Sequence, residues 1–204
     1  MIMAPGMKVG VLALQGDVSE HVAAIESAMR HLSVQGSVVE ARRASELEGI
    51  SALLVPGGES TTMAKQIDRF GLRQPIMDFA KAGNPVMGTC AGAILLASEI
   101  VGSRDPENVK PLGLIDMAVR RNAFGRQVDS FEKPLSIKGL DSDFLGIFIR
   151  APGIEKISKQ VESLAKLDGE HVFVRQGNVM ALTFHPELAH DSRVHAMFLV
   201  MLKP

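Results

Sequence analysis

The sequence has a single cysteine, Cys90, among 204 residues, and it lacks both long hydrophobic runs and blocks of like charge. One cysteine cannot form a disulfide within the chain, and this usage is typical of proteins in a reducing compartment. No apolar segment approaches the roughly 20 residues that cross a bilayer. The N-terminal residues do not combine a basic region with an apolar core, as a secretory signal peptide does. We therefore expect a cytoplasmic protein.

The charge balance also excludes classes of partner. The net charge is −1 at pH 7, from 22 Lys and Arg against 23 Asp and Glu. Without a basic stretch, we expect neither nucleic acid nor a membrane surface as a partner. A hydrophobic content of 46% and a length of 204 residues suffice for one domain with a substantial core. We expect residues 1–6 to form a short extension and residues 7–204 a single domain.

Short apolar segments alternate with amphipathic ones in the first half of the chain. The pattern predicts strands at residues 7–14, 37–41, 52–55 and 85–87, with helices at 18–32 and on either side of Gly71. In the second half it predicts a strand at 144–149, three antiparallel strands at 161–167, 171–175 and 179–184, and a helix at 191–202. This order predicts an α/β protein whose mixed, mostly parallel sheet has helices on both faces.

Cys90 lies between a predicted strand and an apolar helical segment, with Gly88 and Gly92 two residues away on each side. This is the pattern of a nucleophile elbow with sulfur in place of the serine hydroxyl. The sharp turn exposes the side chain at the sheet edge, and the following helix points its free N–H groups at the sulfur, which favours the reactive thiolate. The alternative is a buried structural cysteine.

His185 follows an apolar strand, and Glu187 stands two residues later, after Pro186. Because Pro186 favours an extended backbone at His185, the two side chains are expected to project to the same side. A carboxylate beside an imidazole suits a general base held in one tautomer. A lone cysteine with a distant histidine is the expected layout of a cysteine nucleophile. A metal site of Cys90, His185 and Glu187 is the weaker alternative, since the usual ligand spacings are absent.

A glycine pair, Gly57 and Gly58, follows the predicted strand at residues 52–55. It allows backbone N–H groups to approach a ligand, and we expect the N–H groups of Gly58 and Ala91 to form an oxyanion hole. The alternatives are a phosphate loop, which lacks the Walker lysine, and an ordinary loop with Ser60 or Thr61 as helix N-cap.

Two smaller expectations concern the remaining polar residues. Asp17 and Glu20 have the spacing of a capping box at the start of the first helix. None of the other histidines lies in a glycine-rich or strand-end setting, so we expect surface positions for His21, His31, His171, His190 and His195.

The elbow at residues 88–92, together with His185 and Glu187, resembles the class I glutamine amidotransferases that use a Cys, His and Glu triad. A closer resemblance is to the glutaminase subunits of pyridoxal phosphate synthase, and it rests on residues 14–17, 56–61, 121–127, 148–152 and 184–188. The run Arg-Asn-Ala-Phe-Gly-Arg-Gln at 121–127 is the most specific of these. The likeness extends from about residue 7 to the C-terminus, and it implies a flavodoxin-like, three-layer sandwich.

The resemblance implies a role for each matching residue. Cys90 is the implied nucleophile, His185 the base and then the acid, and Glu187 its orienting partner. The implied glutamine-binding residues are Gly58, Glu59, Ser60, Arg121, Ile149 and Arg150. Arginine suits the substrate carboxylate because its planar fork binds two oxygens. The resemblance implies no metal and no organic cofactor on this chain.

The implied activity is hydrolysis of L-glutamine to L-glutamate and ammonia. The resemblance further implies that the ammonia passes to a barrel-shaped pyridoxal phosphate synthase subunit, the expected protein partner. Two alternatives remain open at this stage: a glutaminase subunit of another synthase, and a catalytically silent regulatory module.

Overall fold

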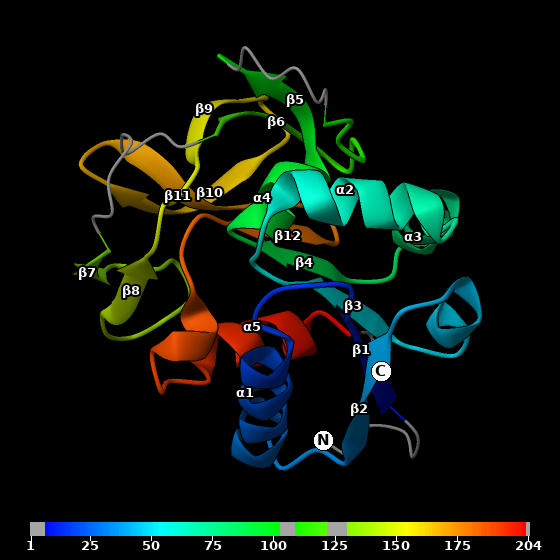
Figure 1. The fold of residues 1–204 in the computed structure, drawn as a ribbon. Helices are drawn as coiled ribbons and strands as arrows, with labels where there is room; N and C mark the ends of the chain where they lie inside the picture. The colour runs from blue at the N-terminus through cyan, green and yellow to red at the C-terminus, as the bar shows by residue number, and fades with distance from the viewer. Residues whose placement is uncertain (1–6, 103–108, 122–129, 203–204) are drawn as a thin grey trace.

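The computed structural model describes residues 7–102, 109–121 and 130–202. The expected extension at residues 1–6 and residues 122–127 of the family-specific run lie outside these ranges. The rest of the chain forms a large mixed sheet, a small two-stranded sheet and the helices that cover them (Figure 1).

The first half of the chain supplies four strands of the parallel part of the large sheet, and a strand near the C-terminus supplies the fifth. Its strands lie in the order β2-β1-β3-β4-β12, and each neighbouring pair in this series is parallel. The five strands are β1 (Met7–Leu12), β2 (Gly36–Ala41), β3 (Ala52–Val55), β4 (Val86–Thr89) and β12 (Val179–Leu182). The order of the first four is that of a flavodoxin-like sheet, as expected.

Helices cover both faces of this parallel part, which confirms the three-layer sandwich. Figure 1 shows α1 (Val18–His31) and α5 (Arg193–Val200) on one face, and α2 (Ser60–Arg69) and α3 (Arg73–Lys81) on the other. The short helix α4 (Ala91–Leu96) follows β4 on the same face as α2. Single turns of 3-10 helix, η1 (Ala44–Leu47) and η2 (Pro186–Leu188), complete the helical elements of the described chain.

Beyond β12 the same sheet continues through antiparallel pairs and ends in one parallel pair, β6 with β5. β12 pairs with β11, which also pairs with β10 and β9, and β9 continues to β6 and β5. These strands are β5 (Ala97–Val101), β6 (Ile115–Arg120), β9 (Gly153–Ile157), β10 (Glu162–Leu167) and β11 (Glu170–Gln176). β7 (Phe131–Leu135) and β8 (Phe144–Phe148) form the small separate sheet.

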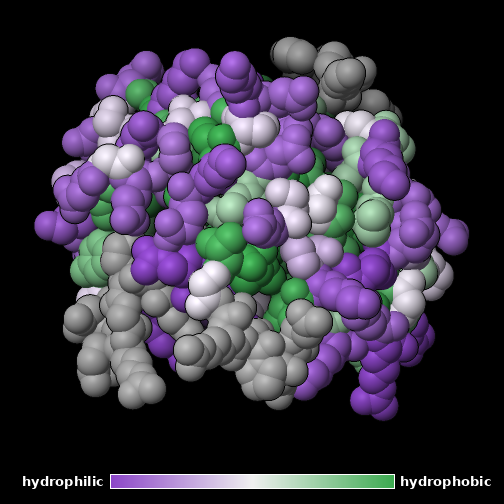
Figure 2. Space-filling view, turned by 90° about the horizontal axis from the view of Figure 1, so that it is seen from above, coloured by the Kyte–Doolittle hydropathy of each residue, from purple (hydrophilic) through white to green (hydrophobic). Residues whose placement is uncertain are grey.

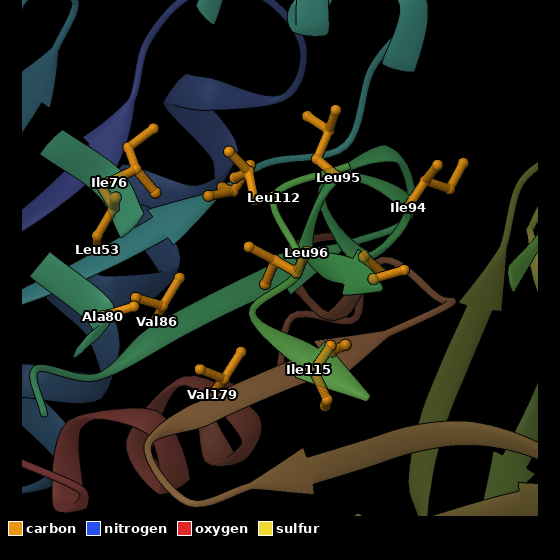
Figure 3. Packing of buried hydrophobic residues seen from close by; sticks show 14 of the residues in the cluster. Leu53, Ile76, Ala80, Val86, Ile94, Leu95, Leu96, Leu112, Ile115 and Val179 are labelled. Atoms are coloured by element: carbon orange, nitrogen blue, oxygen red, sulfur yellow. The ribbon is translucent and has the colours of Figure 1, made fainter. Parts of the chain in front are cut away.

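Side chains that alternate between the two faces of the sheet divide the core into two layers. In β3, Leu53 and Val55 pack with the helices α2, α3 and α4, whereas Ala52 and Leu54 pack with α1 and α5. Successive side chains of a strand point to opposite faces, so a strand buried on both sides must be apolar throughout. Figure 3 shows the first layer, where side chains of α3 and α4 meet those of the strands beneath them.

The surface carries little exposed apolar area. The exposed large hydrophobic side chains of the described residues are Phe70, Leu145 and Val200, which come from separate elements. Hydrophilic residues dominate the face shown in Figure 2, with hydrophobic residues gathered near its centre. Within the described ranges, every helix is too short or too polar to cross a membrane.

One glycine fixes how closely α4 approaches the sheet. A Cβ atom added at Gly92 would lie 2.1 Å from the carbonyl oxygen of Val55, at the end of β3. Gly92→Ala should therefore force α4 away from β3 and destabilise the fold by about 3 kcal/mol. Urea unfolding followed by circular dichroism measures the loss. The matched control is Gly71→Ala in the turn between α2 and α3, where φ is +65° but no atom lies within 4 Å of the added methyl. Backbone strain alone should cost about 1–2 kcal/mol there, and equal losses for the two variants would contradict the steric account.

Candidate active site

Cys90 lies in the turn that joins β4 to α4, as the elbow pattern predicts. Its backbone is strained, with φ of 49° and ψ of −106°, and its N–H donates to the carbonyl of Leu182 at 2.8 Å. A Cβ atom at Gly88 would lie 2.7 Å from the backbone carbon of Gly92. The flanking glycines are therefore required for the turn to close against α4. Strain of this kind persists where the surroundings hold it and is common at functional sites.

His185 reaches Cys90 because β12 runs parallel to β4, with Leu182 paired to Thr89. Both chain segments leave the sheet at the same edge, and His185 and Cys90 line one cavity. The expected contact with Glu187 is present: Nδ1 of His185 lies 2.7 Å from Oε1 of the carboxylate. The backbone differs from the expected extended segment, since Glu187 belongs to the 3-10 turn η2.

The loop after β3 forms the opposite wall of the cavity. Gly58 has φ of 147°, a conformation that favours glycine, and Glu59 N–H donates to the side-chain oxygen of Gln15 at 3.0 Å. The N-cap of α2 is Glu59, whose carboxylate accepts from Thr61 N–H at 3.4 Å. The alternative interpretation, with Ser60 or Thr61 as the N-cap, is therefore off by one or two residues, because the Glu59 side chain reaches forward to Thr61.

Two arginines and a backbone carbonyl complete the cavity. Arg121 Nη2 donates to Oγ1 of Thr61 at 3.0 Å and lies 3.4 Å from Oε1 of Glu59. Arg150 is exposed and has φ of 44°. The carbonyl oxygen of the preceding residue, Ile149, lies 3.9 Å from Sγ of Cys90.

The cavity measures about 330 Å³, and every expected site residue except Glu187 lines it. Glu187 lies behind His185, on the side away from the cavity. The lining residues are Gln15, Gly16, Asp17, Gly58, Glu59, Ser60, Cys90, Ala91, Ile94, Arg121, Ile149, Arg150 and His185. The structure thus collects a thiol, an imidazole, N–H groups and two cations around a space that fits a small polar molecule.

A model of the SNO glutamine amidotransferase family matches residues 11–203. The chain belongs to this family. It is 54% identical over 200 residues to the pyridoxal 5'-phosphate synthase subunit PdxT of Dehalococcoides mccartyi, covering 97% of this chain and 98% of the relative. It is 50% identical over 194 residues to the PdxT of Pyrococcus horikoshii, covering 95% and 98%. A crystal structure of a glutamine amidotransferase has a TM-score of 0.83 and 46% identity, covering 95% of this chain and 98% of that one.

Asp17 was missed as a site residue. It precedes α1, but its side chain makes no capping hydrogen bond, so the capping-box interpretation is wrong. Its Oδ2 lies 3.3 Å from Nδ1 of His185. Gly57 allows this approach, since a Cβ atom there would lie 2.8 Å from the imidazole and 3.0 Å from Asp17. His185 therefore faces two carboxylates rather than one.

The surface positions expected for His21 and His195 are also wrong, because both side chains are fully buried. Asp17, His21, Ile25 and Ala28 recur at helical spacing, so α1 turns His21 inward on the same face as Ile25. This spacing is visible in the sequence and could have indicated that His21 is buried. His195 is buried because α5 packs against α1.

Asp17, His185 and Glu187 each offer one potential metal-ligand atom, and these atoms lie within 4.8 Å of one another. Nδ1 of His185 already has a short contact with Glu187, however, at 2.7 Å. Carboxylate–imidazole hydrogen bonding accounts for the cluster without an ion.

The electrostatics of the site favour a charged His185. Burial alone lowers the pKa of this imidazole, but its contacts with Asp17, Cys90 and Glu187 outweigh burial and raise the pKa from 6.5 to about 12. Contact with His185 lowers the pKa of Asp17, whereas burial raises the pKa of Glu187. A charged imidazole between carboxylates and a thiol suits an ion pair with a thiolate.

The raised pKa gives a titration test. Protonated His185 stabilises the fold fully below pH 6.5, and this contribution is lost only as the pH rises toward 12. The imidazole nitrogens of His185 should therefore keep imidazolium chemical shifts from about pH 5 to 9 in NMR spectra. His171 is the internal control, since burial lowers its pKa below 6.5. A midpoint near 6.5 for His185 would contradict the proposed charge arrangement.

Proposed function

We propose that this chain is the glutaminase subunit of a pyridoxal 5'-phosphate synthase and hydrolyses L-glutamine to L-glutamate and ammonia with a Cys90, His185 and Glu187 triad. One observation carries the assignment of the triad: Cys90, His185 and the arginines line a single cavity. The full-length identity of about half to PdxT subunits supports the synthase to which it belongs.

The geometry supports a two-step acyl transfer. Cys90 Sγ attacks the side-chain amide carbon of glutamine, and His185 Nε2 gives a proton to the leaving ammonia. The product of this step is a γ-glutamyl thioester. His185 then takes a proton from water, the hydroxide attacks the thioester, and glutamate leaves as the thiol is restored. Among the described residues, Nε2 of His185 has no hydrogen-bond partner, which leaves it available for these transfers.

Glu187 and the oxyanion donors support the same steps. The 2.7 Å contact with Glu187 keeps the proton of His185 on Nδ1 whenever the ring is neutral, so that Nε2 can act as a base. The N–H groups of Ala91 and Gly58, from opposite walls of the cavity, are the proposed donors to the oxyanion of each tetrahedral intermediate.

The remaining lining residues are proposed to bind the two ends of glutamine. Arg121 and Arg150 are placed to bind the α-carboxylate, and Glu59 and Ser60 lie on the same wall to accept from or donate to the α-substituents. The carbonyl of Ile149, 3.9 Å from Sγ, is placed to accept from the amide nitrogen that leaves. Arg121 is held in advance by Thr61, so little side-chain entropy is lost on binding.

We propose a barrel-shaped synthase subunit as the partner that consumes the ammonia, with neither nucleic acid nor membrane involved. We also assign the chain to the cytoplasm. The proposed nucleophile must remain a free thiol, and a reducing compartment keeps it so.

Cys90→Ala should lower glutamate release on the order of 10⁴-fold or more while leaving the fold intact, because a triad acts as a unit. The measurement is glutamate release at saturating glutamine, with circular dichroism as a check of folding.

A glutamine-like electrophile supplies the control for this variant. Mass spectrometry should find one label per wild-type chain, on Cys90, the sole cysteine. Labelling that persists in Cys90→Ala would refute the assignment of the nucleophile.

The chain should hydrolyse glutamine slowly alone, because ammonia released without a synthase is wasted. Gly58 has φ of 147° and no Cβ atom, so we propose that its peptide can rotate and turn the N–H away from Cys90 until a partner holds the loop. We expect the purified synthase subunit to raise turnover at least about tenfold, equivalent to about 1.4 kcal/mol of the barrier. Glutamate release with and without the partner, at saturating glutamine, measures this. Equal rates would indicate a stand-alone glutaminase with a preformed site.

A further inference from the structure

Two fully buried histidines lie on the side of Glu187 that faces away from His185. His21 of α1 contacts His195 of α5, with 3.1 Å between Nδ1 of His21 and Nε2 of His195. The other nitrogen of His21, Nε2, lies 3.0 Å from Oγ1 of Thr89 and 3.2 Å from Oε2 of Glu187. His21 therefore touches both chain segments of the proposed triad: Thr89 immediately precedes Cys90, and Glu187 is the partner of His185.

Burial keeps both histidines neutral. Burial lowers the pKa of His21 well below 6.5, with His195 and His185 adding to the effect, and burial lowers the pKa of His195 to about 4. A neutral imidazole carries one N–H, so each ring has one donor and one acceptor.

The neighbours decide which nitrogen of His21 carries the proton. A proton on Nε2 points toward Oγ1 of Thr89 and lies close to Glu187, whereas a lone pair there would lie 3.2 Å from a carboxylate oxygen. With Nε2 protonated, Nδ1 of His21 accepts from Nε2–H of His195. His195 Nδ1, which has no partner among the described residues, is then the unprotonated nitrogen.

We propose that His21 is a positioning residue for glutamine hydrolysis, whose Nε2–H lies close to the second oxygen of Glu187, stabilises its charge and so keeps the imidazole of His185 directed at Cys90. This inference rests on the proposed roles of the triad. Oε1 of Glu187 contacts His185, while Oε2 is buried, lies 3.2 Å from Nε2 of His21 and makes no hydrogen bond of good geometry with the described residues. A buried carboxylate oxygen without a hydrogen bond is costly, and an N–H of His21 3.2 Å away offsets part of that cost when Glu187 is ionised.

Few charged or titratable groups among the described residues surround Glu187. Its charged and titratable neighbours are His21 from α1, His185 after β12, and Asp17 before α1, with His195 of α5 behind His21. Glu20, His190 and Asp191 line an adjoining cavity that also reaches Glu187. Of these, His21 is the group with a nitrogen 3.2 Å from Oε2.

Two variants of His21 distinguish the contribution of its Nε2 nitrogen from that of its Nδ1 nitrogen. The amide nitrogen of glutamine occupies the place of imidazole Nε2, and that of asparagine the place of Nδ1. In complex with the synthase subunit, His21→Asn should lower kcat at least about tenfold with KM nearly unchanged, as losing an outer partner of a reacting group does elsewhere. His21→Gln should keep most of the activity. His31→Asn, on the exposed part of the same helix, is the control and should match the wild type.

The pH dependence of Cys90 alkylation by iodoacetamide distinguishes a positioning role for His21 from a general destabilisation of the core. Because the chain has one cysteine, alkylation reports this thiol alone. A Glu187 that ionises less supports a charged His185 less, so His21→Asn should need a higher pH to reach half its maximal rate, with an unchanged plateau. A core that merely opened would instead alkylate faster at every pH, which would overturn the proposal, as would Asn and Gln variants with equal kcat.

The wild-type protein supplies a test that needs no variant to fold. NMR of the imidazole nitrogens should show neutral His21 with its proton on Nε2, and a proton on Nδ1 would overturn the inference. Failure of the proposed function has a different signature, namely glutamate release that survives Cys90→Ala, and the state of the His21 proton is measured independently of it.

Discussion

The parallel pairing of β4 with β12 is the constraint on which the site depends. Leu182 lies opposite Thr89, so Cys90 and His185, which are far apart in sequence, leave the sheet at the same edge. Parallel strands share the direction in which they end, and α/β proteins bind ligands beyond that edge. β1 and β3 end there as well, which brings Gln15, Asp17 and Gly58 to the same cavity. The proposed catalytic arrangement is thus a consequence of strand order more than of any local motif.

Close packing at this edge requires side chains to be absent at particular points. Gly92 lets α4 approach β3, Gly57 lets Asp17 and the loop after β3 reach His185, and Gly16 packs against the backbone of Gly57. Cys90 and Arg150, at the same edge, have strained backbones with φ of 49° and 44°. Rigid positioning of this kind is what acyl transfer requires, since misplaced groups lose most of their catalytic effect.

The sequence predicted the parts of the structure that depend on local pattern. The strand at 52–55, the break between α2 and α3, and the three strands ending in β12 were readable because their apolar runs and turn residues are strong. β5, β6 and β9 were missed because their partly exposed residues resemble loops, and their pairing partners are distant in sequence. Aspartate is a common helix N-cap, which favoured that role for Asp17. His21 lies in a polar helical segment, which favoured a surface position. The packing of α1 against α5 and η2 shows that His21 is buried and that the half-buried Asp17 lies beside His185.

The central claim is that glutamine is hydrolysed through a thioester on Cys90, and partition of that intermediate tests it most directly. Hydroxylamine competes with water for a γ-glutamyl thioester, so its addition to the complex should yield γ-glutamyl hydroxamate. The account predicts hydroxamate that rises with hydroxylamine concentration at the expense of glutamate. Glutamate formed alone, at a rate and yield independent of hydroxylamine, would contradict a covalent intermediate on Cys90.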